Sequence, residues 1–127
     1  RNFANKLWNI SRFLLLNSQN QATKKTPRDD DVMKELTKTI KAVDSNLKKF
    51  RFAQAAEIIY HFVWHDFADK YIEDYKKELV SYETIKETFL TSLKLLHPFM
   101  PFITEEIWGK LPRKTTNPLI ISSWPTT

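Results

Sequence analysis

Apolar side chains recur along the chain at spacings of three and four residues, which is the period of an amphipathic helix. The first run predicts a helix over residues 2 to about 16, with an apolar face formed by Phe3, Leu7, Ile10 and Leu14. The second predicts a helix over residues 27 to about 49, with an apolar face formed by Val32, Leu36, Ile40, Val43 and Leu47. Thr26 and Pro27 are residue types that begin helices, which supports the second start.

A third run, over residues 52 to about 78, carries two apolar stripes instead of one. The first stripe consists of Phe52, Ala55, Ala56, Ile59, Val63 and Phe67. The second consists of Tyr60, Trp64, Phe67, Tyr71 and Tyr75. A helix with two apolar faces needs neighbours on two sides, so this helix is predicted to lie near the centre of a bundle.

Two further helices are predicted in the C-terminal part of the chain. Ser81 can cap a helix that runs to about residue 96 and buries Ile85, Phe89, Ser92, Leu93 and Leu96. The segment HPFMP ends this helix because Pro98 and Pro101 prevent simple continuation. A short helix over residues 103–111 follows, and the chain then predicts a loop and a brief extended run, LIISSWP.

The composition favours the same fold class. With one Gly in 127 residues and long stretches without Pro, the chain lacks the turn residues that short strands and hairpins need. We therefore predict an all-α fold, a helical bundle of four main helices plus a short fifth helix, in one domain over residues 1–127. The chain has no Cys, which is compatible with a reducing cytoplasm, where we expect the protein to act. Its longest apolar run, residues 13–16, is far too short to span a bilayer.

The net charge of +5 is unevenly distributed along the chain. Residues 1–28 hold six basic and no acidic side chains, whereas residues 29–127 hold 14 basic and 15 acidic ones. The basic excess therefore belongs to the first segment, which favours an anionic partner at that segment. Simple solubility is the alternative explanation.

One face of the first predicted helix carries amides. At 100° per residue, a narrow stripe contains Asn2, Asn5, Asn9 and Arg12, flanked by Trp8 and Phe13. Amides offer a donor and an acceptor together, Arg offers a planar fork, and aromatic rings can stack on unpaired bases. The stripe therefore has the groups needed to read single-stranded RNA. A contact with a neighbouring protein domain explains the amides equally well.

The segment KKFRF, residues 48–52, is a second candidate RNA contact because Lys49 and Arg51 alternate with Phe. In an antiparallel bundle, the end of the second helix lies beside the start of the first. We therefore expect this segment at the same end of the bundle as the start of the amide stripe.

Other polar groups give weaker candidates. His61, His65 and Asp69 have the spacing of metal ligands on one helix face, but no second cluster completes a coordination sphere, and we predict no metal site. Glu105 and Glu106 are adjacent and diverge by 100°, so we expect them in the first turn of the last helix rather than as a catalytic pair. The sequence has no nucleophile–base pair and no glycine-rich phosphate loop, so neither a catalytic residue nor a cofactor is predicted.

A family resemblance is carried by three segments: RNFANKLWN with the following SRF, then FRFAQAAEIIYHFVWHDFADKYIE, then LLHPFMPFITEEIWGKLP. Together they are similar to the helical anticodon-binding domain of the valyl, leucyl and isoleucyl group of class I aminoacyl-tRNA synthetases. The third segment fits all three enzymes, whereas the first two narrow the resemblance to the valyl enzymes. In the third segment we expect the two prolines to fix the turn and three aromatic residues to close the core, namely Phe99, Phe102 and Trp108.

The resemblance implies a function for a larger protein. That protein attaches valine to its tRNA with ATP, in a catalytic domain that lies outside this chain, as the editing and C-terminal coiled-coil domains do. The start at Arg1 rather than Met agrees with a piece of a longer chain. The piece is expected to grip the anticodon of tRNA(Val), chiefly through Asn5, Asn9, Arg12 and Phe13. The alternatives are the same domain of a leucyl or isoleucyl enzyme, and a helical protein-interaction module that binds no RNA.

Overall fold

A computed structural model describes residues 2–20, 24–111, 117–119 and 122–125. Its α-helices are α1 (Asn2–Leu16), α2 (Pro27–Lys48), α3 (Phe52–His61), α4 (Ile72–Lys76), α5 (Tyr82–Leu96) and α6 (Pro101–Lys110). A 3-10 turn, η1 (Ser18–Asn20), follows α1, and a π-helical segment, η2 (Phe62–Tyr71), joins α3 to α4 without a break. These described ranges contain no strand, and the prediction of an all-α bundle is confirmed. Within the same ranges, no helix combines the length and the apolar character needed to cross a membrane.

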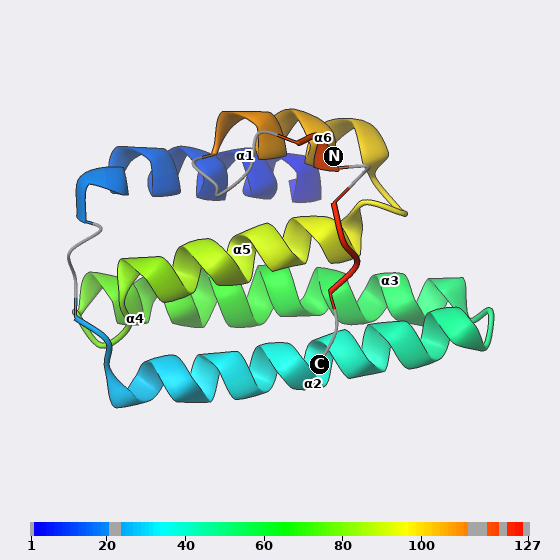
Figure 1. Ribbon diagram of the computed structural model, residues 1–127, viewed down its shortest axis with the longest axis horizontal. Helices are drawn as coiled ribbons and strands as arrows, with labels where there is room; N and C mark the ends of the chain where they lie inside the picture. Colours follow the sequence, from blue (N-terminus) through cyan, green and yellow to red (C-terminus); the bar gives the residue numbers. More distant parts are fainter. Residues whose placement is uncertain (1, 21–23, 112–116, 120–121, 126–127) are drawn as a thin grey trace.

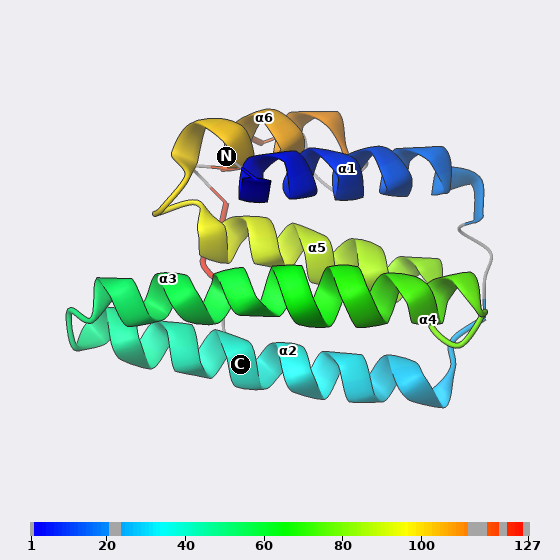
Figure 2. The ribbon, with the colours of Figure 1, turned by 180° about the vertical axis from the view of Figure 1, so that it is seen from behind.

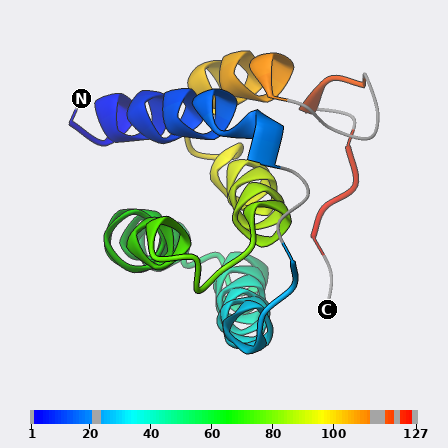
Figure 3. The same ribbon diagram turned by 90° about the vertical axis from the view of Figure 1, so that its left-hand side faces the viewer.

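The helices form two layers. The helices α2, α5 and the continuous α3–η2–α4 run along the long axis of the molecule, and α1 and α6 lie side by side over them (Figures 1 and 2). Figure 3 views α2, α3 and α5 nearly end-on, whereas α1 and α6 run obliquely across the view. The continuous helix contacts α1, α2 and α5. Its predicted place near the centre of the bundle, with neighbours on more than one side, is confirmed.

Two predicted helix starts are confirmed by their caps. At α2, the Thr26 hydroxyl accepts a hydrogen bond from the Asp29 N–H at 3.3 Å, while the Asp29 carboxylate accepts one from the Thr26 N–H at 2.9 Å. This reciprocal pair satisfies two N–H groups that a helix start leaves free. At α5, the Ser81 hydroxyl accepts from the Thr84 N–H at 3.3 Å. Each start therefore follows from a residue type that was visible in the sequence.

Two helix ends close with a residue in the left-handed backbone conformation. They are Phe50 after α2, with φ 59°, and Glu78 after α4, with φ 62°. In both turns the N–H of the following residue donates to the carbonyl five residues earlier, at 2.8 Å after Phe50 and at 2.9 Å after Glu78. Gly is usual at this position, because any other side chain costs roughly 1–2 kcal/mol there.

The middle of the central helix is wound more widely than an α-helix. The N–H of Ile72 donates to the carbonyl of Phe67, five residues earlier, which is the π-helical pattern. The wider turn keeps Val63, Phe67 and Tyr71 buried at a spacing of four residues. The Tyr71 hydroxyl donates to the carboxylate of Glu35 on α2. Burial first, and then this hydrogen bond, raise the pKa of Tyr71, so the hydroxyl keeps its proton and remains a donor.

Two phenylalanines that were predicted in the core are exposed. Phe102 is 90% exposed, because α6 begins at Pro101 instead of residue 103 and this early position faces away from the bundle. Phe52 is 55% exposed because it begins α3, beside the projecting turn after α2. The other two aromatic residues expected to close the core behave as predicted: Trp108 is buried and Phe99 packs against the core.

The earlier start of α6 also changes the position of its acids. The prediction that Glu105 and Glu106 lie in the first turn is wrong, because they are the fifth and sixth residues of α6. Glu105 instead accepts a hydrogen bond from the N–H of Leu119 at 2.7 Å, which fastens the C-terminal segment to α6. In the expected extended run LIISSWP, the Ser122 N–H donates to the Leu119 carbonyl at 3.0 Å. Residues 120–121 of that run, and residues 21–23 and 112–116 of the predicted loops, lie outside the described ranges.

Candidate nucleic-acid interface

The predicted amide stripe lies on the outer face of α1. The inner face of this helix buries Leu7, Ile10 and Leu14 in the bundle. The stripe surface, which we define as Asn2, Asn5, Asn9 and Arg12, is exposed at all four residues. In the part of the chain that the structure describes, their side chains make no hydrogen bond and no ion pair. The amides and the guanidinium are therefore available to a ligand.

A groove of about 210 Å³ runs along one side of the stripe, between α1 and the central helix. It is lined by Lys6, Asn9, Ile10, Phe13, Ala68 and Ile72. The Phe13 ring meets the Tyr75 ring edge-on, with centroids 5.9 Å apart, and the Lys76 ammonium lies 5.5 Å from the Phe13 centroid. Asn9 belongs both to the stripe and to the groove.

Lys6 supplies a positive charge at the edge of this groove. Its ammonium lies 4.6 Å from the centroid of the Trp64 ring and 3.8 Å from the Asp69 carboxylate. These two contacts hold the charge beside Asn9. Lys6 was not among the predicted site residues, although it lies three residues from Asn9 and hence on the neighbouring face of the same helix. Its spacing in the sequence was the signal that could have found it.

The opposite flank of the stripe is formed with α6. The Trp8 ring is half-buried, and the ammonium of Lys110 lies 5.2 Å from its centroid. Trp8 and Phe13 thus each carry a cation over the ring, a favourable contact between a charge and an aromatic face. Lys110 and Lys76 come from α6 and α4. Their place beside α1 depends on the tertiary structure, and the sequence held no signal for it.

The second predicted RNA contact lies at the turn between α2 and α3, where Lys49 and Arg51 are exposed. This turn lies at one end of the long axis, whereas α1 begins nearer the middle, with its first residues towards that end (Figures 1 and 2). Arg12 and Phe13 belong to the last turns of α1, at the other end. The structure therefore divides the predicted tRNA-binding residues into two surfaces, one along α1 and one at the turn.

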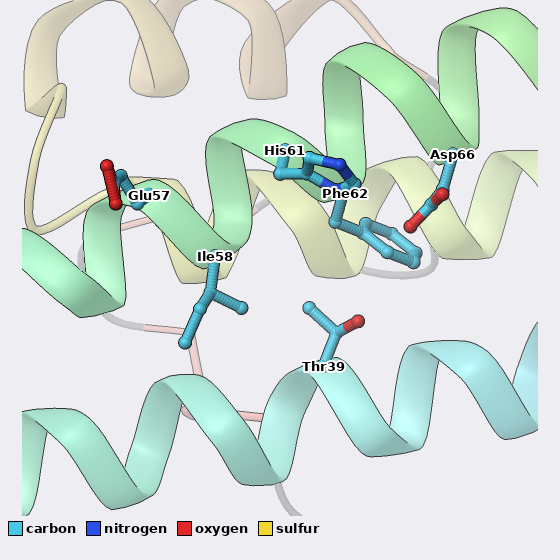
Figure 4. A pocket seen from close by; sticks show the side chains of 6 residues that line it. All are labelled: Thr39, Glu57, Ile58, His61, Phe62 and Asp66. Atoms are coloured by element: carbon cyan, nitrogen blue, oxygen red, sulfur yellow. The ribbon is translucent and has the colours of Figure 1, made fainter.

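A second groove, of about 300 Å³, lies between α2 and the central helix, away from α1 (Figure 4). It is lined by Thr39, Glu57, Ile58, His61, Phe62 and Asp66. Figure 4 shows Glu57 and Asp66 at opposite ends of the groove, so their carboxylates do not converge. The rings of His61 and His65 are in contact at 4.7 Å, yet the described residues hold no group of three side chains arranged for a metal ion.

Comparison with known proteins decides the family. A family model described as the anticodon-binding domain of tRNA ligase matches residues 29–127. The chain belongs to this family. Members are tRNA-binding parts of larger ligase chains.

Individual relatives align with nearly the whole chain. Valine–tRNA ligases of Petrotoga mobilis, Thermotoga maritima and Bacillus anthracis are 39%, 41% and 37% identical to it over 98% of its length. The chain spans 16% of the length of each of these ligases. Although the family model begins at residue 29, these alignments leave out only about 2% of the chain and therefore reach into α1.

Proposed function

We propose that the chain is the anticodon-binding domain of a valine–tRNA ligase and binds the anticodon arm of tRNA(Val). On this proposal a catalytic domain outside residues 1–127 joins valine to the tRNA with ATP, and this domain selects the tRNA. The similarity to three valine–tRNA ligases supports a valyl enzyme over a leucyl or isoleucyl one. The same domain of a sibling enzyme is the alternative.

The observation that carries the proposal is the exposed stripe surface beside a groove. Asn and Arg side chains without partners discriminate bases by hydrogen bonding to base edges, which an unstacked anticodon loop presents. A groove next to them, with the half-buried ring of Phe13 in its wall, gives one such base an apolar contact. Trp8 can serve in the same way on the other flank.

Binding and base reading fall to different side chains. Lys6, Arg12, Lys49 and Arg51 carry charges that neutralise phosphates, which gives an affinity that falls with salt. Asn9 reads the base that enters the groove, and Asn5 and Asn2 extend the row of amides towards the start of α1. Affinity for any tRNA and preference for one anticodon should therefore be lost separately.

The test uses the full-length ligase and the substitutions Asn9→Ala and Arg12→Ala. Both should lower kcat/KM for tRNA aminoacylation by about ten-fold, because each removes a contact worth at least a kcal/mol. Valine-dependent exchange of pyrophosphate into ATP needs no tRNA and should not change. Lys38→Ala, on the exposed side of α2, is the matched control and should leave both activities unchanged.

Binding measurements separate anticodon reading from general attraction. With tRNA(Val) and an anticodon-swapped transcript at two salt concentrations, Asn9→Ala should reduce the difference between the two RNAs. Arg12→Ala should weaken both. Unchanged kinetics and binding in both variants would exclude the stripe surface as the tRNA contact and would favour the protein-interaction module.

A further inference from the structure

The turn between α2 and α3 presents two aromatic rings to solvent. We define the hairpin tip as Lys49, Phe50, Arg51 and Phe52, all of which are exposed. Phe50 is 79% exposed and Phe52 is 55% exposed. The tip projects at one end of the bundle (Figures 1 and 2). Rings at such a position bury little apolar surface, so packing within the domain does not explain them.

The backbone conformation at Phe50 is a second unusual feature of the tip. Phe50 has a φ of 59°, in the left-handed region, and closes the end of α2. Its N–H donates to the Leu47 carbonyl at 3.0 Å, and the Arg51 N–H donates to the Asn46 carbonyl at 2.8 Å. Gly forms this turn without steric conflict, whereas a side chain at this residue is strained. The same turn forms with Glu78 after α4, so closing α2 requires no aromatic ring at Phe50.

The ring of Phe52 contacts the ring of Phe50. The Phe50 and Phe52 centroids are 6.1 Å apart and the planes cross at 74°, an edge-to-face contact. A ring supported at an edge in this way keeps its exposed surface for a flat partner. The tip is thus a small aromatic platform that is organised before any ligand arrives.

Among the residues that the structure describes, the charges beside the platform have no carboxylate partner. Lys48 pairs with Asp44 at 2.9 Å, but in the described part of the chain no carboxylate lies within 4.0 Å of the Lys49 ammonium or the Arg51 guanidinium. Residues 45–56 contain no acid at all. A flat aromatic surface between two uncompensated cations suits a base that lies between two phosphates.

We propose that Phe50 stacks on an unpaired base of the bound tRNA, with Lys49 and Arg51 at the phosphates on either side. This inference rests on the proposed function for the identity of the ligand, but it uses a surface separate from the stripe. Along the long axis of the bundle the tip lies beyond the start of α1 (Figures 1 and 2), so the two surfaces are separate contacts.

The strained turn allows a test in which binding and stability move in opposite directions. In the full-length ligase, Phe50→Gly should raise the Kd for tRNA about ten-fold, the loss of one stacked base. Its unfolding midpoint should stay the same or rise, because Gly relieves the left-handed backbone. Phe50→Tyr keeps the ring and should bind as the wild type does. Glu78→Gly makes the same backbone change after α4 and should leave the Kd unchanged.

Salt dependence distinguishes stacking from charge neutralisation. Phe50→Gly should weaken binding by the same factor at low and high salt, whereas Arg51→Ala should lower the slope of log K against log salt by about one. If Phe50→Gly binds tRNA with the affinity of the wild type, the proposal that Phe50 stacks on a base is wrong. Wild-type affinity together with an altered oligomeric state would assign the tip to a protein partner instead.

The two proposals fail in different patterns. If Asn9→Ala weakens tRNA binding and Phe50→Gly does not, the stripe surface is supported as a tRNA contact and the hairpin tip is excluded. If only Phe50→Gly weakens binding, the hairpin tip is supported and the stripe surface is excluded. If the wild-type ligase binds no tRNA at low salt, both are overturned.

Discussion

The carboxylate of Asp29 accepts a hydrogen bond from the backbone N–H of Ser81 at 2.8 Å, and this bond joins the start of α2 to the start of α5. Its other oxygen accepts from the Thr26 N–H at 2.9 Å. Asp29 is completely buried. One side chain therefore satisfies two N–H groups and fixes the relative position of two helices, at an end of α2 where the helix dipole favours a negative charge.

Replacement of this carboxylate should be costly. Asp29→Ala removes the acceptor of two N–H groups and should lower the free energy of unfolding by about 2–4 kcal/mol. Asp29→Asn keeps one acceptor oxygen and should lose less. The neighbouring Asp30 is exposed, and Asp30→Ala should stay within about 0.5 kcal/mol of the wild type. Urea unfolding of the three variants measures these differences, and equal losses at both positions would contradict the role of Asp29.

The same site predicts how stability depends on pH. Burial acts to raise the pKa of Asp29, but the hydrogen bonds from the backbone N–H groups of Ser81 and Thr26 outweigh it and hold this pKa below its usual value. The unfolded chain, with its ordinary pKa of about 3.9, therefore takes up a proton first as the pH falls. The stabilisation is complete above that value and disappears as the pH falls through the folded pKa. The stability difference between wild type and Asp29→Asn should shrink between about pH 5 and about pH 2, and a constant difference would exclude this carboxylate as the cause.

The last turn of α1 is attached to α5 by a buried tyrosine. The Tyr82 hydroxyl donates to the carbonyl of Leu14 at 2.9 Å. Tyr82→Phe should lower the free energy of unfolding by about 1–2 kcal/mol. It should also speed amide hydrogen exchange at the end of α1, next to Arg12 and Phe13. Tyr60→Phe, at a half-buried ring on the central helix, is the matched control, and faster exchange in both variants would show that this bond does not hold α1.

Two phenylalanines with the same chemistry should respond very differently to truncation. Phe89 is completely buried and stacks on Phe67 with centroids 5.6 Å apart, so Phe89→Ala should cost about 3–5 kcal/mol of unfolding free energy. Phe102 is almost fully exposed, and Phe102→Ala should change stability by less than about 0.5 kcal/mol. Thermal or urea unfolding decides this. A large loss of unfolding free energy in Phe102→Ala would show that Phe102 packs in the core, as the sequence predicted.

The helices were predictable where local chemistry determines them. Thr26 and Ser81 indicate where their helices begin, because their hydroxyls satisfy N–H groups at a helix start. The spacing of Val32, Leu36 and Ile40 likewise predicts a buried face from the local sequence alone. Periodicity does not show where a neighbouring helix stops. For this reason the same reasoning failed at Phe52 and Phe102, which lie at helix starts and are largely exposed.

The candidate site was predictable to a similar extent. The helical repeat of 100° per residue is enough to place Asn2, Asn5 and Asn9 on one face of the helix, and all three are exposed. The groove beside Asn9 depends on how closely the central helix approaches α1, which no local signal encodes. The separation of Arg51 from Arg12 likewise depends on the lengths of α1 and α2.

The winding of the π-helical segment determines how the residues after it are oriented towards α1. Residues after η2 are rotated relative to where an α-helix would put them, and in that rotated position the Tyr75 ring meets both Phe13 and Tyr82. If η2 were wound as an α-helix with the same number of residues, Tyr75 would turn around the axis and leave both rings. Substitutions that favour α-helical winding in η2 would therefore change this contact of α1 without altering α1 itself.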